Sequence, residues 1–146
     1  MGKAKIINEI KIVVPSLSVN ESVARATVAA FCAQIDPAAS ELADIKCVVS
    51  EAVTNCIVHA YREMVGIIYI TVAIYEDNSV KIEIKDKGVG IEDVSLARQP
   101  LYTTDAESER SGMGFTVMES FTDAMRVTSR SGKGTCVVMY KQIKGR

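Results

Sequence analysis

The sequence predicts an α/β (α+β) protein: a two-layer sandwich in which helices cover one face of a mixed β-sheet. Apolar residues recur at every second position near the start, in the middle and near the end of the chain, as expected for strands with one buried face. Helical spacing appears in two segments after the first strand and in one segment before the final strands. With no repeat or linker, 146 residues predict one domain, residues 1–146.

The composition predicts a cytoplasmic globular protein. The chain is 48% hydrophobic and 24% charged, which argues against disorder, and its net charge of −1 argues against direct nucleic-acid binding. We find neither a membrane-spanning apolar run nor a signal-peptide segment. Four cysteines without a C-x-x-C pair, together with a single histidine, disfavour a zinc site, and the cysteines are interpreted as reduced packing residues.

The first part of the chain predicts a strand and a helix. The strand covers Ile6–Val14 and ends at Pro15. Ser18 and Glu21 have the spacing of a capping box, which opens the helix. Arg25 points away from its predicted apolar face, which consists of Val23, Ala26, Thr27, Ala30, Phe31 and Gln34.

A second helix, capped by Ser40 and running to about Tyr61, carries polar residues at steps of four. At roughly 100° per residue, Asn55 lies about 40° and His59 about 80° around the helix from Glu51. The apolar residues of this helix occupy its opposite side. A solvated face is the simplest interpretation of such an isolated Glu/Asn pair, so a function depends on what the rest of the chain supplies.

The second half of the chain predicts two hairpins separated by a loop and a helix. Residues 99–111 are polar and aperiodic, and a loop of this length in a compact domain is often a lid. A short helix before this loop covers 93–98, and another begins in "GMGFTVMESF". The predicted strands are Ile68–Tyr75, Val80–Asp86, Met125–Ser129 and Thr135–Ile143.

Three glycine motifs follow the second helix: "DKGVG", "GMG" and "GKGT". Taken alone, each is explained by a turn that needs a positive φ. Two details favour ligand binding. Gly112 and Gly114 stand at a helix start, where bare N–H groups attract phosphate. Asp86 ends an apolar strand, where a carboxylate is costly unless it meets a donor, such as the exocyclic amine of a base.

Four motifs and their order along the chain resemble the motif boxes of the GHKL ATPase/kinase superfamily, which has the Bergerat nucleotide-binding fold. The motifs are E-x-x-x-N-x-x-x-H, D-x-G-x-G, G-x-G and G-T. The match covers nearly the whole chain. Within the superfamily, the chain is similar to the small bacterial serine kinases that act as anti-sigma factors. Four segments carry this similarity: "NESVARATVAAF", "VVSEAVTNCIVHAY", "ARQPLYTT" and "ERSGMGFTVME".

The resemblance implies ATP/ADP and Mg²⁺ as ligands and assigns roles to the polar edge of the second helix. Asn55 is the implied Mg²⁺ ligand, and Glu51 is the implied general base toward a serine hydroxyl. His59 is interpreted as structural. Arg110 is the implied partner of the γ-phosphate, although an exposed loop arginine is its alternative. The other implied nucleotide contacts are Asp86, Gly88, Gly90, Thr104, Gly112, Met113, Gly114, Phe115 and Thr135.

The resemblance also implies partners. A homodimer would bind and inhibit a sporulation sigma factor, with Arg25 as a partner contact, and would phosphorylate an anti-anti-sigma protein on serine. Two alternatives stay open: a general-stress anti-sigma kinase of the same family, and a nucleotide-gated binding module without kinase activity. The Glu51 carboxylate separates kinase from module, because binding alone needs no base.

Overall fold

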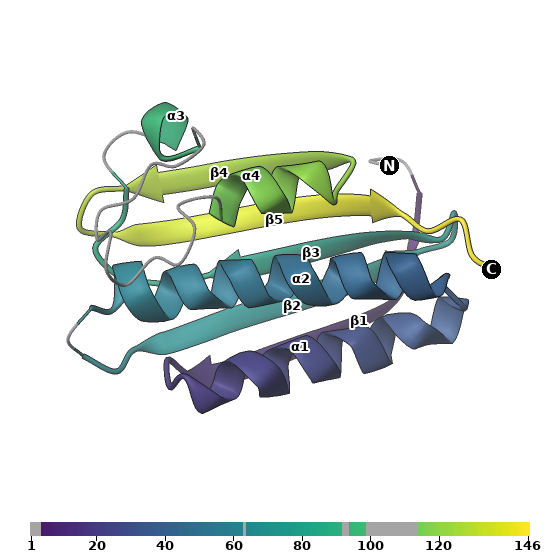
Figure 1. Cartoon of the computed structure of the whole chain (residues 1–146), viewed down its shortest axis with the longest axis horizontal. Helices are drawn as coiled ribbons and strands as arrows, with labels where there is room; N and C mark the ends of the chain where they lie inside the picture. Colours follow the sequence, from purple (N-terminus) through teal and green to yellow (C-terminus); the bar gives the residue numbers. More distant parts are fainter. Residues whose placement is uncertain (1–3, 63, 92–93, 99–113) are drawn as a thin grey trace.

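The computed structural model describes residues 4–62, 64–91, 94–98 and 114–146. These residues form a two-layer sandwich, with a five-stranded sheet behind and α1, α2 and α4 in front of it (Figure 1). The predicted arrangement of helices on one face of the sheet is therefore confirmed. Within the described ranges, no helix has both the length and the apolar character needed to cross a bilayer.

The strands and helices follow the predicted order along the chain. The strands are β1 (Ile6–Pro15), β2 (Ile67–Tyr75), β3 (Ser79–Lys85), β4 (Ala124–Arg130) and β5 (Gly134–Gln142). The α-helices are α1 (Val19–Cys32), α2 (Ala39–Asn55), α3 (Val94–Ala97) and α4 (Gly114–Ser120). A 3₁₀ turn (Ala33–Ile35) follows α1, and a π-helical turn (Cys56–Ala60) continues α2.

The sheet has the strand order β1-β2-β3-β5-β4, and each adjacent pair of described strands is antiparallel. The sequence predicted a mixed sheet, whereas the neighbouring described strands are all antiparallel. Because β3 and β4 are both antiparallel to β5, they run in the same direction, as expected for strands joined by a connection that contains helices. The last strand, β5, then inserts between them, so no two parallel strands become neighbours.

The core lies between the sheet and the helices. Alternate side chains of the central strands point toward the helix layer and are almost fully buried. Packing this face against α2 removes large aliphatic side chains from water, at about 1.5–3 kcal/mol for each full burial. The largest of these side chains are Ile68, Ile70, Ile74, Ile82, Ile84 and Met139 from the sheet, and Ile45, Val48, Val49 and Val53 from α2.

The predicted apolar face of the first helix is only partly correct: Phe31 is half-buried and packs against the core, but three of the other predicted residues do not. Val23, Ala26 and Ala30, which were assigned to the core, are exposed. The buried positions are Ala24, Val28, Ala29 and Cys32. Both sets of residues are apolar and spaced by three or four, so the pattern by itself does not distinguish them.

The first helix begins directly after Ser18, as predicted, but the predicted capping contacts and the start of the second helix are revised. Ser18 makes no side-chain cap hydrogen bond, and Glu21 instead pairs with Arg25 at 3.0 Å. The second helix begins after Ala38 rather than Ser40, and the Glu41 carboxylate accepts the Ala38 N–H at 2.8 Å. A carboxylate at this position satisfies one of the donors that every helix start leaves without an intrahelical partner.

Candidate active site

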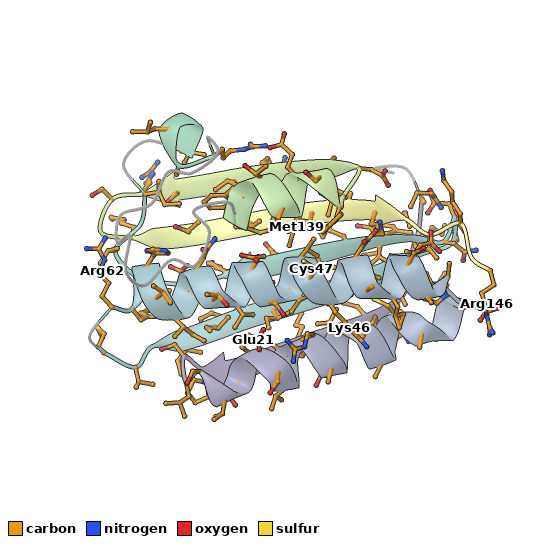
Figure 2. The ribbon with its side chains drawn as sticks, viewed as in Figure 1. Glu21, Lys46, Cys47, Arg62, Met139 and Arg146 are labelled. Carbon is orange, nitrogen blue, oxygen red and sulfur yellow. The ribbon has the colours of Figure 1, made fainter. Side chains whose placement is uncertain are left out.

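The polar edge of α2 faces the start of α4. A Cβ atom added to Gly114 would lie 3.4 Å from both the Glu51 Oε2 and the Asn55 Oδ1. Cys47, four residues before Glu51, lies on the edge of α2 toward α4, whereas Lys46 lies toward α1 (Figure 2). The structure therefore brings Glu51, Asn55 and Gly114 close together.

Several predicted site residues surround this edge. Phe115, the second residue of α4, is half-buried and packs against the core. His59 lies in the π-helical turn beyond Asn55 and is also half-buried. Thr104, Arg110, Gly112 and Met113 lie outside the described residues. Their implied contacts with nucleotide phosphates stay predictions.

Asp86 is a buried carboxylate just beyond the end of β3, with 5% of its surface exposed. Its Oδ1 accepts two backbone N–H groups, from Gly88 at 2.9 Å and from Thr135 at 3.2 Å. Its Oδ2 accepts the thiol of Cys56, with an Sγ–Oδ2 distance of 3.5 Å. The structure thus joins three predicted site residues, Asp86, Gly88 and Thr135, and adds Cys56, which sequence reasoning had assigned to packing.

The loop after Asp86 is tied to the end of the second helix. The Tyr61 hydroxyl accepts the Lys87 N–H at 2.6 Å and donates to the Ile67 carbonyl at 2.8 Å. The Ala60 carbonyl accepts the Val89 N–H at 3.1 Å. A Cβ at Gly88 would overlap that Ala60 carbonyl, so the loop reaches this position only with glycine.

The β4–β5 turn holds the other side of the same loop. Gly90 has φ 78°, and a Cβ there would overlap the Arg130 carbonyl oxygen. The Ser129 hydroxyl accepts the Ile91 N–H at 2.8 Å and lies 2.8 Å from the Thr135 hydroxyl. Ser129 therefore links the loop to Thr135, a role that no motif in the sequence indicated.

Burial controls the electrostatics of this end of the site. It raises the pKa of the Asp86 carboxyl, opposed by the Gly88 N–H, the Cys56 thiol and the Thr135 N–H, in that order. Burial, and then the nearby Asp86, raise the pKa of the Cys56 thiol well above its usual range. The thiol consequently carries its proton at neutral pH and is available as a donor to the carboxylate.

Three residues of this arrangement were not identified from sequence: Cys56, Tyr61 and Ser129. A weak signal existed for two of them. Cys56 directly follows Asn55 and Tyr61 ends the predicted helix, so both are close in the chain to predicted site residues, although helical periodicity puts Cys56 about 100° around the helix from Asn55. Their partners, Asp86 and Lys87, are at least 26 residues away in the chain, and only the fold brings them together.

The donor set suits Mg²⁺ held mainly by a bound ligand. Within the described residues, no group of three or more His, Cys, Asp and Glu side chains gathers as a protein-only metal site. Asn55 offers a neutral amide oxygen beside the glycine start of α4. Mg²⁺ usually takes one or two protein oxygens, with phosphate oxygens and waters completing its octahedron.

Comparison with known proteins agrees with this geometry. Residues 14–141 match the model of the histidine kinase-like ATPase domain. An anti-sigma F factor from Caldanaerobacter subterraneus subsp. tengcongensis is 59% identical over 128 residues, which cover 88% of this chain and 89% of that protein. One from Geobacillus sp. (strain WCH70) is 56% identical over 137 residues, 93% of each chain. The chain belongs to the anti-sigma F factor family. The family lies within the GHKL superfamily, and its ATPase-type domain implies ATP binding.

Solved structures support the fold. The crystal structure of the RsbU and RsbW domains of a Mycobacterium tuberculosis protein superimposes with a TM-score of 0.68 at 20% identity, over 93% of this chain and 32% of that chain. The histidine kinase domain of the Erythrobacter litoralis EL346 blue-light activated histidine kinase gives a TM-score of 0.56 at 17% identity, over 84% of this chain and 61% of that chain. At these identities the likeness concerns the fold alone.

Proposed function

We propose that this chain is an anti-sigma factor and ATP-dependent serine protein kinase, which binds and inhibits a sporulation sigma factor and phosphorylates its anti-anti-sigma antagonist on serine. One observation supports this most directly: Glu51 and Asn55 converge on the glycine that begins α4. A base and a metal ligand thereby meet at one place, in a family named for anti-sigma activity.

The reaction divides its tasks along α2. Asn55 would hold Mg²⁺ through its amide oxygen, and the ion would supply positive charge that neutralises the nucleotide phosphates. Glu51 accepts the proton of the substrate serine hydroxyl as that oxygen bonds to the γ-phosphorus, and the bond from the γ-phosphorus to the bridging oxygen breaks to release ADP. Gly112, Met113, Gly114 and Phe115 surround the phosphates, Thr104 contacts the nucleotide, and Arg110 stabilises the charge on the γ-phosphate.

The base of the nucleotide lies at the other end of the site, against Asp86. The Asp86 carboxylate accepts a hydrogen bond from the exocyclic amine of adenine, and Gly88 and Gly90 let the backbone approach the adenine ring. The surroundings of Asp86 support this assignment, because the carboxylate is buried and its Oδ2 accepts only one described donor, the weakly donating Cys56 thiol, which leaves acceptor capacity for an amine. Thr135 completes the adenine end beside Asp86.

Incubation with γ-labelled ATP and a candidate anti-anti-sigma protein tests the kinase. We expect label on a serine of that partner and none without Mg²⁺. Label on no partner, with ATP still bound, would favour the nucleotide-gated binding module. Label on a general-stress partner instead would favour the general-stress anti-sigma kinase.

The partner surface is proposed on α1. Arg25 lines a groove between α1 and α2, whose other walls include exposed Val23, Ala26 and Ala30. These apolar side chains are the ones that the sequence analysis assigned to the core. Arg25 also pairs with Glu21 and lies 3.3 Å from the Ser50 hydroxyl, so its guanidinium is held at the groove. An oriented cation beside exposed apolar side chains is a common composition for a protein interface.

Charge reversal tests this surface. We expect Arg25→Glu to weaken sigma-factor or anti-anti-sigma binding by about tenfold or more while ATP affinity stays unchanged, because Arg25 contacts Glu21 and Ser50 in the groove between α1 and α2, whereas Glu51 and Asn55 face α4. Arg126→Glu, on an exposed position of β4, is the matched control. Equal pull-down of both partners by Arg25→Glu and wild type would remove Arg25 from the interface.

A homodimer is the proposed assembly. β1 is an edge strand whose outer backbone groups are available for pairing, and it exposes Ile7 and Val13 at 58% and 61%. An edge strand of ten residues with exposed apolar side chains favours association with another chain. Sedimentation equilibrium distinguishes dimer from monomer directly.

A further inference from the structure

The two carboxylate oxygens of Asp86 have unequal surroundings. Oδ1 accepts two backbone N–H groups, which match its two lone pairs. Oδ2 accepts a single described donor, the thiol of Cys56. One lone pair of Oδ2 is therefore left for a further donor, such as a ligand amine.

Cys56 is held rigidly where it meets Oδ2. It is the first residue of the π-helical turn, and its carbonyl accepts the Tyr61 N–H at 3.0 Å, five residues on. Only 3% of its surface is exposed. Single π-turns inside α-helices often lie at functional sites, because the extra residue per turn redirects the side chains around it. This turn begins directly after Asn55 and so links the metal end of the site to the base end.

We propose that Cys56 is a positioning residue for base recognition: its S–H bond holds Oδ2 of Asp86 so that the remaining lone pair faces the exocyclic amine of adenine. The inference rests on the proposed binding of ATP at Asp86. It assigns Cys56 a role beyond packing, since a thiol is the least polar side chain that can still donate here. A weak donor orients the carboxylate without consuming the acceptor strength that the amine requires.

Binding of two nucleotides tests the role. The probes are Mg-ATP and the Mg salt of purine riboside triphosphate, whose base lacks the exocyclic amine, each titrated calorimetrically. For Cys56→Ala we expect affinity for Mg-ATP to fall about 3- to 10-fold, the effect of one net hydrogen bond, while affinity for the purine nucleotide changes less than about twofold. Cys56→Ser restores a donor and should bind Mg-ATP within about twofold of wild type.

Cys32→Ala is the matched control, because Cys32 is a fully buried thiol in the core at the end of α1. It should alter thermal stability without altering the preference for ATP. Three results would overturn the role of Cys56: unchanged ATP affinity in Cys56→Ala, equal losses for both nucleotides, or a Cys56→Ser variant that behaves as Cys56→Ala does. If wild type bound neither nucleotide, the proposed ATP site itself would fail and Cys56 with it.

Discussion

The two halves of α2 use polar residues in different ways. In the first half, the Glu41 carboxylate accepts N–H groups from Ala38, Lys144 and Gly145, and Asp44 pairs with Lys141 at 3.3 Å. These contacts join the helix start to the end of the chain. In the second half, Glu51 and Asn55 point at α4, and Cys56, the first residue of the π-helical turn that continues α2, contacts Asp86.

The difference is one of burial and donor strength rather than of donor number, because Glu41 and Asp86 each accept three described hydrogen bonds, two at one oxygen and one at the other. Glu41 is half-buried, and all three of its donors are backbone N–H groups, as in a helix cap. Asp86, which meets the π-helical turn after α2, is only 5% exposed, and the single described donor to its Oδ2 is a thiol, a weak donor. A deeply buried carboxylate oxygen with only a weak donor is the stronger indication of a ligand site, and four substitutions examine that distinction.

The largest effect is expected for Glu51→Gln. This change keeps the size of the side chain but removes the basic oxygen, so phosphoryl transfer to serine should slow by about 10²–10⁴-fold. Because a carboxylate beside phosphates repels them, Mg-ATP should bind at least as tightly as to wild type. Single-turnover assays measure the transfer, and transfer at the wild-type rate would leave Glu51 without a catalytic role.

Asn55→Ala should weaken Mg-ATP binding by about 10- to 100-fold, the effect of losing a contact to a charged group. The fold should persist, because Asn55 lies on the partly exposed edge of its helix. Calorimetry with and without Mg²⁺ measures the effect. Equal affinities for mutant and wild type would contradict the metal assignment.

Asp86→Asn should reduce ATP affinity by about tenfold or more and should not destabilise the ligand-free protein at neutral pH. Burial raises the pKa of Asp86 above its usual 3.8, so folding disfavours the charged form. The stability contributed by the protonated carboxyl is present below pH 3.8 and is lost as pH rises through the raised pKa. Urea denaturation across this range should show the loss in wild type but not in Asp86→Asn.

Glu41→Gln should have the smallest effect: a loss of about 1 kcal/mol in the free energy of unfolding at neutral pH, with ATP binding unchanged. Burial acts to raise the pKa of Glu41, but the N–H groups of Lys144, Ala38 and Gly145 and the charge of Lys141 lower it overall. Its stabilising contribution is thus present above the usual value of 4.5 and is lost as pH falls through the lowered pKa.

The two carboxylates should therefore respond to pH in opposite directions. Denaturation of Glu41→Gln and Asp86→Asn, measured side by side from acid to neutral pH, checks this. Matching trends in the two variants would contradict the contrast between a half-buried helix cap and a buried site carboxylate.

Much of the site was predictable because its residues lie in short motifs. Glu51 and Asn55 share one helix edge by helical periodicity, and the glycines of "DKGVG" and "GMG" mark places where backbone approaches another group. Family resemblance then related the motifs to one another. By contrast, Cys56, Tyr61 and Ser129 act through partners remote in the chain, and no local pattern encodes such contacts.

By itself, the sequence determined the kinds of elements, their order and the polar edge of α2, since periods of two and of about 3.6 residues are local properties. The tertiary structure decided three further points: which apolar face of α1 is buried, the insertion of β5 between β3 and β4, and the contact between Cys56 and Asp86. The physical reason is the same for each. Local spacing shows which residues share a face, but only packing against the other layer selects what that face meets.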